Sequence, residues 1–245
     1  MTLTSEQIAD YERDGFLVVN GLLSDEEMAM FLSEEEKEKP DDWRGLGLRR
    51  YTKDPQWKHV AMHPKISGIV AQLLEGKPRI VQTMFMNKQP DGGTGVALHQ
   101  DAHYIRNEPN TLMACWVAFS DTDRDNGGLC VVPGSHKRQL YKTGPPEDDT
   151  EHASWEKDYE MRGPDGVVWE EPMHSHEIQG LNRDELVYLS VPKGSGVFFT
   201  STTIHGSFAN RSGDRPRLAF ATHYVKDGTW VYRTDIQETV LVEGV

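Results

Sequence analysis

The sequence predicts a mainly β protein with flanking helices, in which a helical N-terminal part precedes a many-stranded sandwich or jelly roll. Helical periodicity dominates up to residue 76, whereas short apolar runs bounded by turn residues dominate from Lys77 onward. Those runs do not alternate with helical segments, which argues against βαβ units. Neither a linker nor an internal repeat interrupts the 245 residues. We therefore expect one domain over 1–245, with a helical part at 1–76 and a jelly-roll core at 77–245.

Three helices are expected in the helical part. The first begins at Thr4 or Ser5, either of which can cap it, and ends at Gly15, after which "FLVVN" forms a short strand. Ser24 caps the second helix, whose first turn carries the acidic residues that the helix dipole favours. The third helix, "PKISGIVAQLLEG", opens at Pro64 and places apolar residues at helical spacing. These segments predict a helical layer on the β body.

The β core begins with "RIVQTMFMNKQ", which alternates in the manner of a strand. One face of this strand is expected to carry Gln82, Met84, Met86 and Lys88. "VALHQDAHYI" is expected as the next strand, followed by "TLMACWVAFSD" and "LCVVPGS". The Asn126-Gly127 pair between the last two predicts a hairpin.

A long acidic segment, rich in proline, glycine and aromatic residues, separates these strands from the last three. It runs from about residue 139 to 184 and shows no regular period. A loop of this length inside a compact domain is usually functional, such as a lid, or disordered. We therefore expect an irregular insertion at 139–184.

Composition argues against two classes of partner. Acidic residues outnumber basic ones 39 to 26, and the formal charge of −13 repels phosphate backbones, so no nucleic-acid partner is expected. No apolar window is long enough to span a bilayer and the N-terminus lacks signal-peptide features, so no membrane partner is expected. Cys115 and Cys130 make no disulfide framework, which favours a reducing, cytoplasmic location.

The stretch "LHQDAHY" carries the first candidate site. On a strand, residues i and i+2 point to the same face, so His99 and Asp101 project together, and His103 joins them if the strand stays regular. Two histidines and one carboxylate form the facial triad that holds non-haem Fe(II) and leaves three positions open. We expect the third ligand, His205, on a strand near the opposite end of the barrel.

An arginine downstream of His205 extends this site. Arg217 begins the strand that follows "IHGSFANRSGDRP". A planar guanidinium binds a carboxylate through two parallel hydrogen bonds, so Arg217 suits the distal carboxylate of 2-oxoglutarate. A 2-oxo acid can chelate the iron at two of its open positions, and dioxygen can take the third.

Three motifs in order resemble the phytanoyl-CoA dioxygenase family of Fe(II)/2-oxoglutarate-dependent oxygenases. They are "HQDAHY", "CWVAFSDTDRDNGGLCVVPGSH" and "IHGSFANRSGDRPRLAFATHY", and "YERDGFLVVNGLLSDEE" near the N-terminus is also typical. The resemblance covers roughly residues 8–225. It implies a double-stranded β-helix, which is a cupin-like jelly roll with flanking helices.

The resemblance also implies roles for single residues. His99, Asp101 and His205 match the iron ligands, and Arg217 matches the arginine that binds 2-oxoglutarate. Because "NRSGDRPR" carries one residue more than the family pattern, Arg215 is an alternative to Arg217. Ser207 and Trp116 match residues that line the cosubstrate pocket. Gln82 lies where the family contacts cosubstrate or substrate, and Arg49, before the third helix, is a candidate for a second carboxylate contact.

The implied activity is hydroxylation of a small organic molecule by dioxygen, with conversion of 2-oxoglutarate to succinate and carbon dioxide. Related halogenases have a small residue in place of the carboxylate ligand, whereas this chain keeps Asp101. Two alternatives remain open. The same iron site could carry out desaturation, epimerisation or ring formation, or the protein could be a non-catalytic metal-binding jelly roll. Arg217 argues against the second, because a structural metal site needs no carboxylate anchor.

Overall fold

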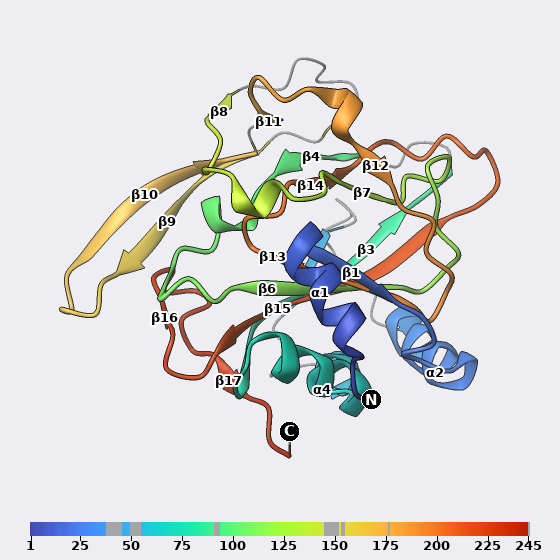
Figure 1. The fold of residues 1–245 in the computed structure, drawn as a ribbon, viewed down its shortest axis with the longest axis horizontal. Coiled ribbons are helices and arrows are strands. Elements are labelled where there is room, and N and C mark those ends of the chain that lie inside the picture. Colours follow the sequence, from blue (N-terminus) through green and yellow to red (C-terminus); the bar gives the residue numbers. More distant parts are fainter. Residues whose placement is uncertain are drawn as a thin grey trace.

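Two facing β-sheets form the body of the protein in the computed structural model (Figure 1), which describes residues 1–37, 46–49, 55–90, 94–144, 152, 155–175 and 177–244. The larger sheet has seven strands in the order β1-β13-β6-β15-β3-β17, with β2 also paired to β3. The smaller sheet has the order β12-β7-β14-β4. The fold is the predicted mainly β jelly roll with flanking helices.

The larger sheet comprises β1 (Phe16–Val19), β2 (Leu46–Arg49), β3 (Pro78–Lys88), β6 (Met113–Ala118), β13 (Gly196–Thr200), β15 (Arg217–Lys226) and β17 (Val240–Leu241). The smaller sheet comprises β4 (Val96–His99), β7 (Leu129–Val131), β12 (Val187–Tyr188) and β14 (His205–Ser207). Short pairs flank them: β5 (Asn107–Glu108) with β16 (Trp230–Val231), and β8 (Thr143–Gly144) with β11 (Glu177–Ile178). Two strands of the expected helical part, β1 and β2, thus belong to the larger sheet.

The central strands of the larger sheet are buried on both faces, most fully β6. In β6, Cys115 packs in the cluster that lies under the helices, while its neighbour Trp116 packs in the cluster between the two sheets. The same alternation in β3 directs Phe85 to the helices and Met86 to the interior. This confirms the alternation predicted for β3, and it explains why the sequence of β6 reads as an unbroken apolar run.

Within the described part of the chain, four α-helices flank the larger sheet: α1 (Ser5–Asp14), α2 (Asp25–Lys37), α3 (Pro55–Ala61) and α4 (Pro64–Leu73). The predicted starts of α1 and α2 are confirmed, and both are capping boxes. Thr4 Oγ1 accepts from the Gln7 backbone N–H at 3.2 Å, and the Ser24 hydroxyl does the same for Glu27 at 3.2 Å. Helix α3 was not expected, because its seven residues are too short for a helical period to show.

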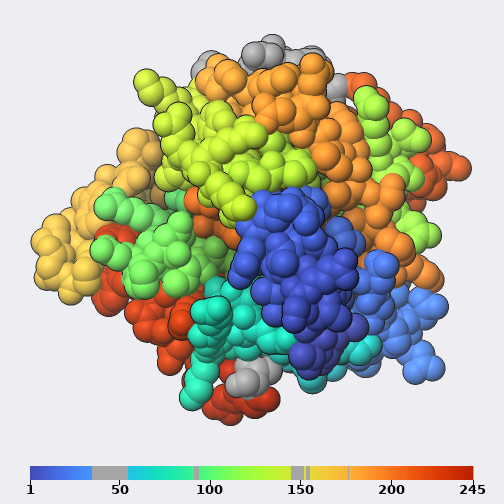
Figure 2. Space-filling model, in the orientation of Figure 1, coloured from blue at the N-terminus to red at the C-terminus, as the bar shows by residue number. Residues whose placement is uncertain are grey.

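The C-terminal end of helix α1 is held by two loops, the one before β14 and the one after β7. Gly15 ends the helix in the left-handed conformation at φ +80°, and its carbonyl accepts from the Thr203 hydroxyl at 2.7 Å. The Gly134 backbone N–H donates to the Asp14 carbonyl at 2.8 Å. Figure 2 shows the two segments in contact at the surface, with the N-terminal residues in dark blue beside the yellow-green segment.

The hairpin predicted at Asn126-Gly127 is wrong. A turn does lie there, with Gly127 at φ +76°, but β6 before it pairs with β13 and β15, whereas β7 after it pairs with β12 and β14. The turn therefore carries the chain from one sheet to the other. A Cβ atom at Gly127 would lie 2.7 Å from the Phe208 carbonyl oxygen, so this crossing requires glycine.

The expectation of an irregular insertion at 139–184 is also wrong in part. The segment contains an antiparallel hairpin formed by β9 (Glu156–Arg162) and β10 (Val168–His174), which extends from the body in Figure 1. It also contains β8 and β11, and Ile178 of β11 packs with Leu98 and Cys130 on the outer side of the smaller sheet. The insertion thus covers this sheet.

Two features bear on the compartment and membrane expectations. Cys115 and Cys130 are both free thiols in buried positions, and burial raises the pKa of Cys130 to about 12. Among the described residues, no helix combines the length and the apolar character that crossing a bilayer requires.

Phe31 of α2 is expected to dominate the contact between this helix and the sheet. Its ring lies 4.8 Å from that of Phe119 and 5.4 Å from that of Phe220, between centroids, and the side chain is buried. Phe31→Ala should lower the free energy of unfolding by about 3–5 kcal/mol in urea titrations. Met30→Ala, on the exposed face of the same helix, should change it by less than about 0.5 kcal/mol. Equal losses in both variants would contradict this packing.

Candidate metal centre

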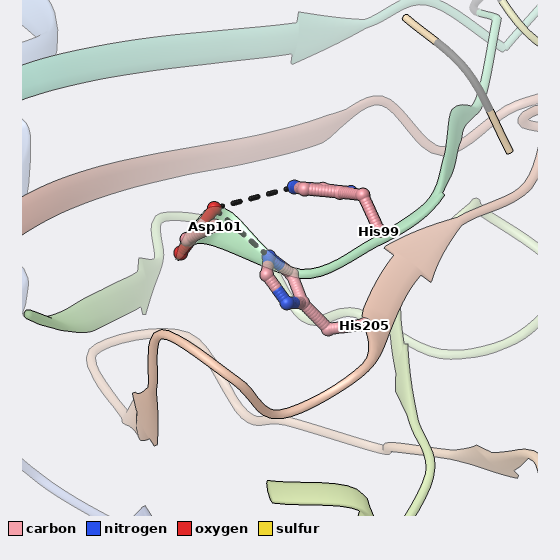
Figure 3. Close-up of side chains that lie close together, drawn as sticks. All are labelled: His99, Asp101 and His205. Atoms are coloured by element: carbon pink, nitrogen blue, oxygen red, sulfur yellow. Dashed lines mark ion pairs between the residues drawn. The ribbon is translucent and has the colours of Figure 1, made fainter. Parts of the chain in front are cut away.

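Three side chains meet at the inner edge of the smaller sheet. One donor atom from each of His99, Asp101 and His205 lies within 4.8 Å of the other two. Figure 3 shows both imidazoles directed at the same carboxylate oxygen, with His99 at the end of β4 and His205 at the start of β14. The structure thus brings together the three residues that the sequence singled out as metal ligands.

The route by which they meet differs from the sequence-based expectation. Strand β4 ends at His99, and Asp101 begins a single 3-10 turn, Asp101–His103. The buried amide of Gln100 holds this turn, because its Nε2 donates to the Thr202 carbonyl at 2.8 Å. The expected regular strand through Asp101 and His103 is therefore wrong, and His103 lies at the end of the 3-10 turn.

His205 does not lie at the opposite end of the barrel. Strand β14 is the neighbour of β4, and His205 is the register partner of His99. Residues more than a hundred positions apart in the chain thus become direct cross-strand neighbours, whose Cβ atoms lie about 4.5–5.5 Å apart in antiparallel sheets.

Backbone carbonyls orient both imidazoles. His99 Nδ1 lies 2.7 Å from the Ala97 carbonyl oxygen, and His205 Nδ1 lies 3.0 Å from that of Thr203. Because a carbonyl only accepts, each Nδ1 carries the proton and each Nε2 keeps a free lone pair. The Nε2 atoms lie 3.3 and 3.7 Å from Asp101 Oδ1.

Burial and neighbouring charges set the protonation states that metal ligands need. Burial, followed by the proximity of His99, lowers the pKa of His205 to about 4. Burial opposes ionisation of Asp101, yet His205, His223 and His99 together hold its pKa well below its usual range. At neutral pH the centre therefore presents a neutral imidazole at His205 and a carboxylate at Asp101.

These donors fit a divalent transition metal. Two donor atoms at right angles about an ion at about 2.1 Å lie roughly 3 Å apart, close to the observed separations between Oδ1 and the two imidazole nitrogens. Two imidazoles and one carboxylate on one side of an ion are the ligand set of non-haem Fe(II) sites.

A cluster of buried cationic side chains contacts strand β14 next to the metal donors. Arg217, at the start of β15, is buried and its guanidinium carbon lies 5.9 Å from the centroid of the Trp116 ring. Ser207 lies two residues beyond His205 on β14, which places both on one face. The structure thus gathers three of the predicted cosubstrate residues: Arg217, Ser207 and Trp116.

Lys88 is the member of this cluster that the sequence analysis did not identify. It is the register partner of Arg217, and its Nζ donates to the Ser207 hydroxyl at 2.7 Å. Lys88 Nζ and Arg217 Nε both donate to the carbonyl of Gly127, each at 3.2 Å, so the two cations are close neighbours. The available signal was the alternation of β3, which placed this lysine on the inward face.

Among the residues that the structure describes, no carboxylate pairs with Lys88 or Arg217, and Arg217 Nη1 is buried without a partner. Burial, and then the charge of Arg217, lowers the pKa of Lys88 well below its usual value. Buried charges are strongly destabilising unless they are paired. The cluster of Lys88 and Arg217 is therefore suited to bind an anion with a terminal carboxylate.

The other predicted cosubstrate residues lie elsewhere. Arg215 is partly exposed and pairs with Asp123 at 2.6 Å, so its guanidinium is directed away from Lys88 and Arg217. Gln82 faces the interior, but its Nε2 lies 3.3 Å from His223 Nδ1 rather than near Arg217. Arg49 ends β2 opposite Thr83, and its side chain lies outside the part of the chain that the structure describes.

Residues 11–219 match the family described as Phytanoyl-CoA dioxygenase (PhyH). The chain belongs to this family. It is 32% identical over 251 residues to the peroxisomal phytanoyl-CoA dioxygenase of Rattus norvegicus, a match that covers 91% of this chain and 68% of that protein. The chain spans about two thirds of the length of the phytanoyl-CoA dioxygenases that it matches.

Solved structures share the fold at lower identity. The epimerase SnoN, in complex with Fe3+, alpha-ketoglutarate and nogalamycin RO, is 22% identical with a TM-score of 0.70, over 93% of this chain and 85% of SnoN. EctD from S. alaskensis, with 2-oxoglutarate and 5-hydroxyectoine, is 16% identical with a TM-score of 0.66, over 91% of this chain and 76% of EctD.

Binding of 2-oxoglutarate is expected to take up a proton at Lys88. Burial lowers the pKa of this amine in the unliganded protein, whereas a bound carboxylate favours the ammonium form and raises the pKa, so a proton is taken up at pH values between the two. The affinity should therefore be constant below the lowered pKa and fall as pH rises through it towards the raised pKa of the complex. Calorimetry in buffers of different ionisation enthalpy measures the uptake. Lys88→Met should abolish it, and uptake that persists in this variant would contradict the assignment.

Proposed function

We propose that the protein is an Fe(II)- and 2-oxoglutarate-dependent oxygenase that hydroxylates a small organic molecule and releases succinate and carbon dioxide. One observation carries the proposal: a His-Asp-His donor set adjoins two buried cations that lack a carboxylate partner among the described residues. Membership of the phytanoyl-CoA dioxygenase family supports it. So do the iron and 2-oxoglutarate named for SnoN, and the 2-oxoglutarate named for EctD.

Each part of the site has a task in this reaction. His99, Asp101 and His205 would hold the iron on one side and leave the other side open. When bound, the iron supplies the activation of dioxygen that is coupled to decarboxylation of 2-oxoglutarate.

Lys88, Arg217 and Ser207 would bind the distal carboxylate and thereby turn the 2-oxo acid end towards the iron. Trp116, whose ring lies beside the Arg217 guanidinium, would form an apolar wall next to this carboxylate. The burial of these side chains excludes water from the reacting atoms.

Asp101 favours hydroxylation over halogenation, because a carboxylate at this position leaves no ligand site for a halide. Epimerisation and ring formation remain the second candidate outcome, supported by the likeness to SnoN, which is an epimerase. The iron site is the same in both cases. The outcome depends on which atom of the substrate is presented to the iron, so the product distinguishes them.

Aromatic side chains next to His99 are suited to bind an organic substrate. The Tyr104 ring lies 5.4 Å from that of His99, and the Trp155 ring lies 5.7 Å from that of Tyr104. Tyr159 of the β9–β10 hairpin continues the row, 6.4 Å beyond Trp155. A half-buried aromatic surface of this kind contributes apolar contact area to a small molecule.

The partners in this proposal are dioxygen and a small-molecule substrate, with no nucleic acid and no membrane. The reducing, cytoplasmic location expected from the sequence remains part of the proposal. Two free, buried cysteines support it.

Anaerobic addition of Fe(II) and 2-oxoglutarate should produce a weak visible charge-transfer band of the chelate. Asp101→Ala should abolish the band through loss of the metal. Arg217→Ala should weaken 2-oxoglutarate binding by about 2–3 kcal/mol, because it removes charged hydrogen bonds. Arg215→Ala is the matched control: it removes a partly exposed arginine, two residues before Arg217, that pairs with Asp123, and it should leave affinity within about twofold. A reversed pattern for the two arginines would assign the anchor to Arg215.

In air, the reconstituted protein should convert 2-oxoglutarate to succinate, and faster with a substrate present. Mass spectrometry of products across a panel of small molecules should show the gain of one oxygen atom. A product of unchanged mass would indicate epimerisation, and loss of two hydrogens would indicate desaturation or ring closure. Metal binding without any succinate would contradict an oxygenase and favour a non-catalytic metal-binding protein.

A further inference from the structure

A hydrogen-bonded chain of three side chains ends at the candidate metal centre. His223 Nε2 lies 3.1 Å from Asp101 Oδ2, and His223 Nδ1 lies 3.3 Å from Gln82 Nε2. Gln82 and His223 are register partners on β3 and β15, and His223 and Asp101 are both buried. A shift of register follows His223 directly, and such an irregularity re-aims a side chain relative to a regular strand.

The chemistry of the carboxylate sets the direction of this chain. An ionised Asp101 can only accept, so His223 Nε2 must carry the proton and donate it. His223 Nδ1 is then an acceptor and needs a donor, which is the amide N–H of Gln82. Gln82 thus holds His223 in the tautomer that donates to Asp101.

The two oxygens of Asp101 therefore have different partners. Oδ1 faces the Nε2 atoms of His99 and His205, at 3.3 and 3.7 Å, whereas Oδ2 is taken by His223 on the other side. A carboxylate held in this way can offer one oxygen to a metal. A carboxylate without such a partner can rotate and bind an ion through both oxygens.

We propose that His223 and Gln82 are positioning residues that restrict Asp101 to one-oxygen coordination and so keep the remaining metal positions open. This inference rests on the proposed function, because the open positions are those that 2-oxoglutarate and dioxygen would occupy. It gives Gln82 a task other than the cosubstrate contact expected from the sequence. Partners that orient the ligands of a metal commonly change metal affinity or activity 10- to 100-fold when removed.

Cobalt(II) is a suitable probe, because the intensity of its visible bands reports the number of ligands. The variants are His223→Leu, which removes the donor, and His223→Gln, whose amide N–H can reach Asp101 in its place. His63→Leu is the matched control: His63 is another buried histidine, 3.0 Å from Glu27 Oε1, between α2 and α4. Urea unfolding of each variant establishes that it is folded.

His223→Leu should bind cobalt(II) roughly 10- to 100-fold more weakly than the unaltered protein, with altered band intensities. His223→Gln should recover most of the affinity and the original spectrum. His63→Leu should lose stability with no change in cobalt(II) affinity. Gln82→Leu leaves the imidazole in place and should weaken binding by a smaller factor, which provides a second test if His223→Leu does not fold.

Affinity and spectrum unchanged in His223→Leu or, if that variant does not fold, in Gln82→Leu would overturn the inference. The proposed function would still stand if the unaltered protein binds cobalt(II) and forms succinate with iron. Failure of the unaltered protein to bind cobalt(II) would overturn both. An equal loss of affinity in His63→Leu would also overturn the inference, because the effect would then reflect general destabilisation.

Discussion

The pairing of β3 with β15 holds both halves of the candidate site in place. Along the inward face of this pair, Lys88 lies opposite Arg217 at one end and Gln82 lies opposite His223 at the other. Small and flexible apolar residues fill the space between, where Met86 lies opposite Ala219. Because side chains alternate between faces along a strand, a slip of one residue in either strand would turn the two polar side chains of that strand towards the helices. The apolar residues that point the other way, such as Phe85 and Phe220 against Phe31 of α2, set the register and therefore position the site.

Charge is distributed unevenly along this interior. The metal end holds a buried carboxylate surrounded by three imidazoles, whereas the other end holds two buried cations that share one backbone carbonyl. Each end is electrostatically incomplete: a divalent ion would compensate the first and a carboxylate the second. Burying unpaired cations lowers the free energy of unfolding of the unliganded protein. Proteins tolerate such a loss of stability at functional sites, where a bound ligand compensates the charge. The bound state is thereby expected to be the more stable one.

Predictions from short sequence patterns were correct where residues adjacent in the sequence determine the local structure. The capping residues of α1 and α2 and the alternation of β3 were predicted from a few adjacent residues each, and the structure agrees. The errors arose where distant segments decide the backbone. The Asn126-Gly127 turn joins two sheets rather than two paired strands, and the strand through His99 stops because the side chain of Gln100 bonds to the Thr202 carbonyl. The β9–β10 hairpin was not predicted, because its outward face is acidic and carries no apolar run.

The sequence by itself determined the fold class, the family and the residue types of the candidate metal donors, because hydrophobic spacing and short motifs are sufficient to identify them. It also narrowed the anion-binding residue to two arginines. Only the tertiary structure distinguishes the two, because it buries Arg217 beside Lys88 and leaves Arg215 paired with Asp123, and this difference supports Arg217 as the proposed anchor. Only the tertiary structure revealed Lys88 and His223 as neighbours of the site. His223 and Asp101 are 122 positions apart, and no local pattern encodes a hydrogen bond that forms when two sheets close on each other.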